Sequence, residues 1–206
     1  AAAQRGEADI ADAARAGDAV AAAIGDRVER DSAAVRRRPA DYPVDVSDSD
    51  MWPVMYNGVG GGSLIFGGHW PRFLPSDFRV RSLDGVADDW PIRYEDLVPY
   101  YEAVDEFIGA SGLEGDPAYP DGLEYPQPPL PMGKGGRRMA EAMNRLGWHW
   151  WPSDAAINST EYDGRPGCNN CGPCDLGCAT GARSSADVTY WPLALQLGVD
   201  LRTHCR

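Results

Sequence analysis

The stretch Val59-Gly-Gly-Gly-Ser63-Leu-Ile-Phe-Gly67-Gly68-His69-Trp70-Pro-Arg72 is the part of this chain that decides its interpretation. It is not a phosphate-binding P-loop, because no Lys-Ser/Thr pair follows the glycines. It is also not the G-x-G-x-x-G opening of a Rossmann helix, because a proline comes next. Such a stretch either brings bare backbone close to a flat or anionic ligand or forms a tight turn. The residues alone leave both interpretations open.

A second informative stretch, Cys168-Asn-Asn-Cys171-Gly-Pro-Cys174-Asp-Leu-Gly-Cys178, holds four of the five cysteines. Its spacing, C-x2-C-x2-C-x3-C, is the run with which bacterial ferredoxins hold an iron–sulfur cluster. Unlike that run, the last cysteine is followed by alanine and no second motif exists. Thiolate ligands that lie close together bind iron–sulfur clusters, zinc or Cu(I) in preference to hard metal ions. Three interpretations therefore stay open: a cluster, a zinc site, and unligated thiols or a local disulfide.

The composition limits the class of protein. The 206 residues suffice for one domain, or one and a half, with a real core. A net charge of −12 argues against nucleic acid as a partner. No apolar run approaches the roughly 18 residues of a membrane helix, so no transmembrane segment is expected.

The ends and the cysteines give weaker indications. The amino end lacks the basic and apolar pattern of a secretory signal, and the chain has no initial methionine, which favours an excerpt of a longer protein. Clustered cysteines are unlike the disulfide framework of a secreted domain. The cytoplasm is therefore the expected compartment, with the periplasm as the alternative.

Local patterns predict several helices, long loops and short strands. An early proline and a glycine just past the end predict helices over 99–108 and 189–197, and Gly147 marks the end of another helix over 136–146. A weak stripe of apolar residues over 1–38 is compatible with a helical arm or a disordered one. Residues 110–135 read as a long irregular excursion, and short strands are expected at 148–152, where three tryptophans predict a large buried area, and at 199–205.

Taken together, several separated motifs resemble the glucose–methanol–choline (GMC) family of FAD-dependent oxidoreductases. They are the glycine-rich stretch, 89–101, Tyr162-Asp-Gly-Arg-Pro166 before the cysteines and Gly181-Ala-Arg-Ser184 after them. The resemblance covers roughly residues 39–206. It implies an α+β fold of the GMC flavoprotein type, of which the chain carries the middle. The chain would then be a partial FAD-binding domain over 39–206 with inserted helices and loops and a cysteine-rich loop at 168–178, preceded by the arm at 1–38.

The resemblance also implies which residues contact the cofactor. The first part of the stretch would wrap the pyrophosphate–flavin region of FAD: Val59, Gly60, Gly61, Gly62 and Ser63. The second part would lie beside the isoalloxazine ring: Gly67, Gly68 and His69. Two positions depart from the family pattern, because Phe66 stands where many members carry Asn or His and Tyr56 replaces a small residue. A hydrogen bond to the flavin is therefore either missing or supplied by His69.

For the cysteines, the resemblance points to a 3Fe–4S cluster. Some dehydrogenase members hold one on C-x5-C-x3-C, the spacing of Cys168, Cys174 and Cys178, to which Cys171 is an addition. The implied function is oxidation of a CH–OH group of an alcohol or sugar, with electrons leaving the flavin, through the cluster, for an external acceptor such as a cytochrome subunit.

Two other interpretations compete: a non-catalytic iron–sulfur or metal-binding electron-transfer module, and an inactive truncated remnant. The chain contains no Rossmann unit for the ADP half of FAD and no residue that can be nominated as catalytic base. We therefore expect this polypeptide alone to be inactive and to bind FAD weakly.

Overall fold

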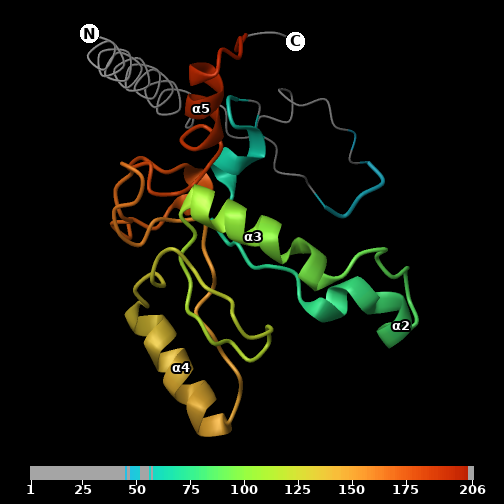
Figure 1. Cartoon of the computed structure of the whole chain (residues 1–206). Coiled ribbons are helices and arrows are strands. Elements are labelled where there is room, and N and C mark those ends of the chain that lie inside the picture. Colours follow the sequence, from blue (N-terminus) through green and yellow to red (C-terminus); the bar gives the residue numbers. More distant parts are fainter. Residues whose placement is uncertain (1–44, 46, 52–55, 57, 204–206) are drawn as a thin grey trace, which may run out of the picture. The chain divides into compact units, whose positions relative to one another are not determined.

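The computed structural model describes residues 45, 47–51, 56 and 58–203 (Figure 1). They form two compact units, and each unit is made of segments that alternate along the sequence with segments of the other. Unit 1 holds the described residues up to Gly67, then Gly172–Gly181 and the described residues from Ser185 onward, and unit 2 holds Gly68–Cys171 and Ala182–Ser184. The arm expected over 1–38 lies outside the described residues. Within the described residues, no helix is long and apolar enough to cross a bilayer.

Unit 2 contains most of the helical structure: η3 (Pro75–Arg79), α2 (Val80–Asp84), α3 (Tyr94–Ile108) and α4 (Lys134–Leu146). The helices expected at 99–108 and 136–146 are confirmed, and both begin earlier than predicted. The early start of α3 has a local cause. The backbone N–H of Arg93 donates to the Asp96 carboxylate at 2.8 Å, and the Asp96 N–H donates to the Arg93 carbonyl at 3.1 Å, which closes the first turn before Pro99.

The carboxyl end of α3 is fixed by glycine. Gly109 has φ 69°, and its N–H caps the last turn of the helix. A Cβ at this position would lie 2.6 Å from the Tyr162 ring and 2.9 Å from the Gln127 amide nitrogen. No other residue fits this position, so the end of α3 meets the segments around Gln127 and Tyr162 directly.

A short buried segment, Asp154–Asn158, is the centre of unit 2. Along one edge it pairs with the chain at Gly68–Trp70 and at Ala182–Ser184, through backbone bonds of 2.8–2.9 Å. Along the other edge, Ala155 exchanges both backbone bonds with Ser111. All of these pairings among the described residues are isolated antiparallel bridges, so the β component of the fold is a set of contacts between distant segments.

An aromatic core joins η3 to α3. Phe78 and Tyr94, 3% and 4% exposed, meet with ring centroids 6.5 Å apart and edge to face. Phe78 also contacts Phe73 and Trp90, each at 6.2 Å, and Tyr94 contacts Tyr101 at 5.9 Å. Such edge-on pairs add to the stability from buried area.

Unit 1 contains η2 (Gly61–Ile65), η4 (Cys174–Leu176) and α5 (Tyr190–Gln196). The helix expected over 189–197 is confirmed as α5, and Gly198, with φ 86°, follows its end. The irregular excursion expected over 110–135 is also confirmed, because α4 begins only at Lys134.

The two strand predictions are wrong for the residues described. Residues 148–152 form no strand: Trp148 is 63% exposed, and its backbone N–H instead bonds the Met143 carbonyl at 3.0 Å, just past the end of α4. The large buried area expected for the three tryptophans is therefore not found at Trp148. Residues 199–203 likewise show no strand pairing, and the rest of that prediction lies outside the described residues.

Candidate functional site

The glycine-rich stretch begins as a tight turn in unit 1. Gly60 has φ 97°, and a Cβ there would lie 2.2 Å from the Leu64 side chain and 3.1 Å from the Asp187 backbone nitrogen. The Ser63 hydroxyl donates to the Gly60 carbonyl at 2.6 Å and accepts from the Ala186 N–H at 3.0 Å. The turn is thus held by contacts with Leu64 and Ser63, which belong to the stretch itself, and with residues 186–187, which are distant in sequence.

The other side of this turn is open. Among the residues that the structure describes, a Cβ on Gly61 or Gly62 would meet no atom within 4 Å, and of these two glycines Gly61 has a positive φ, of 57°. Backbone without side chains next to open space allows a ligand to approach closely. The residues therefore fit the group that the sequence predicted here, a flat or anionic cofactor. Val59, half-buried, begins the turn.

In unit 1, η2 packs against η4, which begins at Cys174. The glycine-rich turn and the middle of the cysteine loop are more than a hundred residues apart in sequence, and the fold makes them neighbours. The sequence predicted each of these segments as a site but not that they touch.

Further along the stretch, Gly67 ends one part of unit 1 and Gly68 and His69 begin unit 2. Gly68 is buried, with φ 84°, and a Cβ there would lie 2.6 Å from the Ile157 side chain, so packing requires this glycine. His69 is exposed, and its Nδ1 lies 2.9 Å from the Ser153 hydroxyl.

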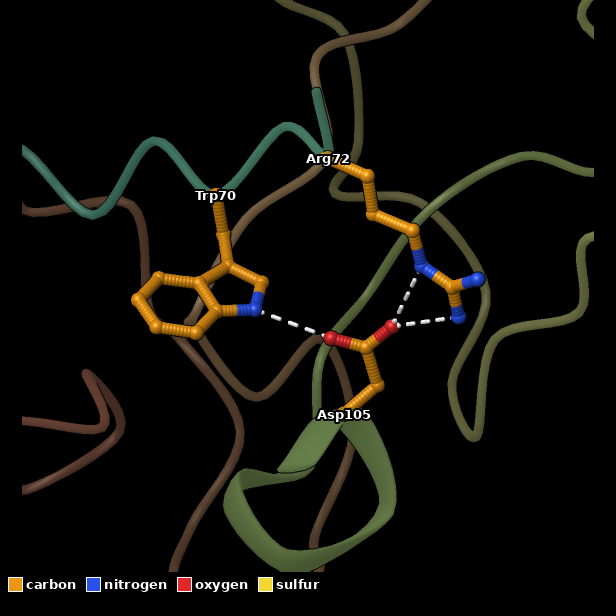
Figure 2. A network of polar contacts seen from close by, with 3 residues as sticks. All are labelled: Trp70, Arg72 and Asp105. Atoms are coloured by element: carbon orange, nitrogen blue, oxygen red, sulfur yellow. Dashed lines mark hydrogen bonds and ion pairs between the residues drawn. The ribbon is translucent and has the colours of Figure 1, made fainter. Parts of the chain in front are cut away.

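The end of the stretch is anchored by a buried carboxylate, Asp105, on α3 (Figure 2). One of its oxygens accepts from the Trp70 indole N–H at 2.9 Å, and the other accepts from Arg72 at 3.1 and 2.8 Å. Arg72 also lies over the Tyr101 ring, 5.2 Å from its centroid. Burial opposes the charge of Arg72, but hydrogen bonding and the charge of Asp105 outweigh it and raise the pKa of the guanidinium.

Arg72 therefore serves structure in this chain. Nothing in the sequence predicted this role for Arg72. The role of Asp105 could have been expected, because Asp105 lies on the stripe of α3 that Tyr94, Tyr101 and Ile108 define at helical spacing. An acidic residue on such a stripe needs a buried partner.

A second polar network closes the carboxyl end of α3. The Ile108 carbonyl accepts from Arg165 at 2.6 Å and from the Ser184 hydroxyl at 2.7 Å, and the Gly109 carbonyl accepts from the Gln127 amide. Asn158 joins the same network through the carbonyls of Tyr162 and Arg165, and its own carbonyl accepts from the Cys168 N–H at 2.8 Å. This network holds the chain at the entrance to the cysteine loop.

The cysteine loop is largely at the surface: Cys171 is exposed and the other three cysteines are half-buried, and none of the four forms a disulfide. Asn170, with φ 56°, donates its N–H to the Cys168 sulfur at 3.3 Å, a bond of the type that stabilises cluster-bound thiolates. Positive φ angles at Gly172 and Gly177 supply the expected bends. Within the described part of the chain, no group of three or more His, Cys, Asp or Glu is arranged to hold a metal ion. The donor chemistry suits a cluster, and the ligand set stays a prediction.

The remaining histidines play no part in these features. His149 is half-exposed, its Nε2 lies 3.0 Å from an Asp116 carboxylate oxygen, and its ring stacks on Trp151, with ring centroids 6.1 Å apart. Its neighbours in sequence are Trp148, which is exposed, and Trp150, which is half-buried. His204 lies outside the described residues.

Comparison with known proteins shows similarity to dehydrogenases and oxidases. The chain is 46% identical over 176 residues (84% of the chain, 31% of the relative) to a 2-methyl-1,2-propanediol dehydrogenase from Mycolicibacterium austroafricanum. It is 37% identical over 127 residues (58% and 23%) to the fructose dehydrogenase large subunit from Gluconobacter japonicus. It is 33% identical over 161 residues (75% and 29%) to a 6'''-hydroxyparomomycin C oxidase from Streptomyces lividus.

The chain spans about a third or less of the length of these relatives. No family model matches it. The names of these relatives share one reaction class, oxidation by a dehydrogenase or oxidase, and two of them name an alcohol or a sugar.

Proposed function

We propose that the chain is part of a GMC-type, FAD-dependent oxidoreductase that oxidises a CH–OH group of an alcohol or sugar. The observation that carries the proposal is the glycine-rich turn, fixed on one side by Leu64 and Asp187 and open on the other at Gly61 and Gly62. This turn falls in the stretch that resembles the family signature. The dehydrogenase and oxidase names of the relatives support the reaction class.

The roles of the residues follow from their positions. The backbone from Val59 to Ser63 would hold the cofactor, with Gly67, Gly68 and His69 beside its ring. FAD, when bound, supplies the hydride acceptor. Because Nδ1 of His69 is engaged with Ser153, its Nε2 is the nitrogen available to the cofactor. The buried contacts of Asp105 to Trp70 and Arg72 fix the chain just after His69.

The cysteine loop forms the second part of the proposal. Cys168, Cys174 and Cys178, with Cys171 as an additional thiol, would hold a 3Fe–4S cluster, which supplies a one-electron relay to an external acceptor. Packing of η2 against η4 supports this, because it makes the loop a neighbour of the glycine-rich turn. A cytochrome subunit is our proposed acceptor, prompted by one relative being named as a large subunit.

A replacement experiment tests the flavin part. The matching segment of the Mycolicibacterium dehydrogenase is exchanged for this chain, and flavin retained after gel filtration and dye reduction with 2-methyl-1,2-propanediol are measured. We expect retained flavin and activity. The Gly62→Val variant should bind FAD roughly tenfold more weakly or worse, because overpacking against a close ligand costs about 1–3 kcal/mol. Its melting temperature should be unchanged, since a Cβ there meets no atom of the described residues within 4 Å.

The matched control is Gly133→Val, where a Cβ also meets nothing and φ is −66°. It should retain flavin. If both valine variants retain flavin equally, the open side of the turn is not where the cofactor lies.

The cysteine run favours a second candidate, a metal-binding electron-transfer module without flavin chemistry. Iron and zinc analysis and EPR of the anaerobically purified chain, with Cys174→Ser, distinguish the two. About three irons per chain and an oxidised-state signal lost in the variant would support the cluster. Iron bound by a replacement protein that never retains flavin would favour the second candidate, and a chain without iron would leave the cysteines a structural role.

A further inference from the structure

The surface of α4 differs in charge from the rest of the chain. The helix carries four basic residues and one acidic residue, within a chain of net charge −12. Lys134, Arg138 and Arg145 recur at steps of four and seven, so they share one face, and all three are exposed. The exposed Glu141 lies on the same face, which therefore keeps an excess of positive charge.

Beside these cations lies an exposed apolar stripe. Met139 and Leu146, seven positions apart, are each 62% exposed, and Trp148 is 63% exposed. The Gly147 cap and the bond from the Trp148 N–H to the Met143 carbonyl fix Trp148 at the end of the helix. The body of unit 2 covers a different side of the helix, at Ala140, which is 7% exposed. We call these residues the α4 surface: Lys134, Arg138, Met139, Arg145, Leu146 and Trp148.

We propose that the α4 surface binds the face of an anionic lipid bilayer, with the three apolar side chains entering the interface. Lys and Arg beside Trp, Leu and Met on one helix is the pattern of helices that lie in a membrane interface. The charge of the helix, opposite to that of the chain, is complementary to an anionic leaflet.

The charges disfavour a second copy of this chain as the occupant. A symmetric pairing through the α4 surface would bring the cations of both copies together. An acidic protein shares the charge complementarity, but the exposed Leu146 and Trp148 beside the basic residues favour a lipid interface, which adapts to any apolar outline. The proposal does not depend on flavin or cluster binding.

Vesicle sedimentation tests the proposal with the chain itself. Vesicles of phosphatidylcholine alone are compared with vesicles of phosphatidylcholine and phosphatidylglycerol in equal parts, at low and high salt. We expect binding only to the anionic vesicles, and less of it at high salt, where surface charges are screened. The Arg138→Glu/Arg145→Glu variant should bind roughly tenfold more weakly or worse. The Met139→Ser/Leu146→Ser variant should also bind more weakly, because it removes two of the apolar side chains that enter the interface. Both side chains are exposed, so their loss should leave the fold intact.

The matched control is Arg93→Glu/Arg202→Glu, which changes net charge by the same amount at two exposed arginines outside α4. It should bind like the unaltered chain, and circular dichroism should show all variants folded. Absence of binding to anionic vesicles, or a loss as large in the control as in the α4 variants, overturns the proposal. So does concentration-dependent dimerisation through α4, or binding to polyglutamate without binding to vesicles, which would assign the surface to an acidic protein.

Discussion

Replacing Asp105 by alanine removes the acceptor of three hydrogen bonds at once, and the two from Arg72 are buried. The carboxylate is 2% exposed, Arg72 is 6% exposed, and their closest oxygen and nitrogen are 2.8 Å apart. In the Asp105→Ala variant the guanidinium stays buried over the Tyr101 ring without its counter-charge, and the Trp70 indole loses its acceptor.

The expected loss is large because of burial. Breaking a buried ion pair from one side costs about 3–5 kcal/mol, since the remaining charge is uncompensated. Arg202 and Asp200 provide a matched comparison: their atoms are also 2.8 Å apart, but the side chains are 79% and 68% exposed. An exposed pair contributes at most about 1 kcal/mol. The two ion pairs have the same nitrogen–oxygen distance, but breaking the buried pair should lower the free energy of unfolding severalfold more than breaking the exposed pair.

Urea unfolding, followed by tryptophan fluorescence and far-UV circular dichroism, measures both. We expect Asp105→Ala to lower the free energy of unfolding by about 3–5 kcal/mol and Asp200→Ala by at most about 1 kcal/mol. Adding Arg72→Met to Asp105→Ala should recover part of the loss, because the unpaired charge is then gone. Equal losses for Asp105→Ala and Asp200→Ala, or no recovery in the double variant, would refute the reasoning.

Three further outcomes are expected. Gln127→Leu, which leaves the buried Gly109 carbonyl without its amide donor, should destabilise unit 2 by about 1–3 kcal/mol in the same urea assay, and an unchanged midpoint would contradict it. Burial raises the pKa of the Asp154 carboxyl above its usual 3.8, so the folded state holds the carboxyl proton more tightly than the unfolded state does. The free energy of unfolding should therefore fall as pH rises from 3.8 through the raised pKa. Urea midpoints across that pH range should show this fall in the unaltered chain and a smaller one in Asp154→Asn, which cannot ionise. Gly60→Ala should cost about 1–3 kcal/mol, because its φ is 97° and the space is filled, whereas Gly133→Ala should change thermal stability little.

Helices were predictable because their signals are local. Proline near the start and glycine after the end act within one turn, and α3, α4 and α5 all end at or next to the expected glycine. The starts were less predictable, because the bond between Arg93 and Asp96 overrides the proline that suggested a later beginning.

Pairings between distant segments were not predictable. Asp154–Asn158 is short and begins and ends in polar residues, and its partners lie far away in sequence. Conversely, Trp148 to Trp151 has the composition of a strand but finds no partner segment. The sequence identified the glycine-rich turn and the cysteine loop as candidate sites, but the packing of η2 on η4 needed the fold. The roles of their residues in cofactor binding stay predictions.

The position of Asp154–Asn158 also has a consequence for synthesis on the ribosome. Its partners near Gly68 and Ser111 emerge before it, but its partner Ala182–Ser184 emerges later. At roughly 5–20 residues per second, the nascent chain waits on the order of seconds for this last partner. During that interval the Asn158 N–H and the Ala156 carbonyl lack their acceptor and donor, and the end of α3 lacks Ser184. Unit 2 therefore completes only after most of the cysteine loop has been made, and chaperone demand should be greatest while that loop is being translated.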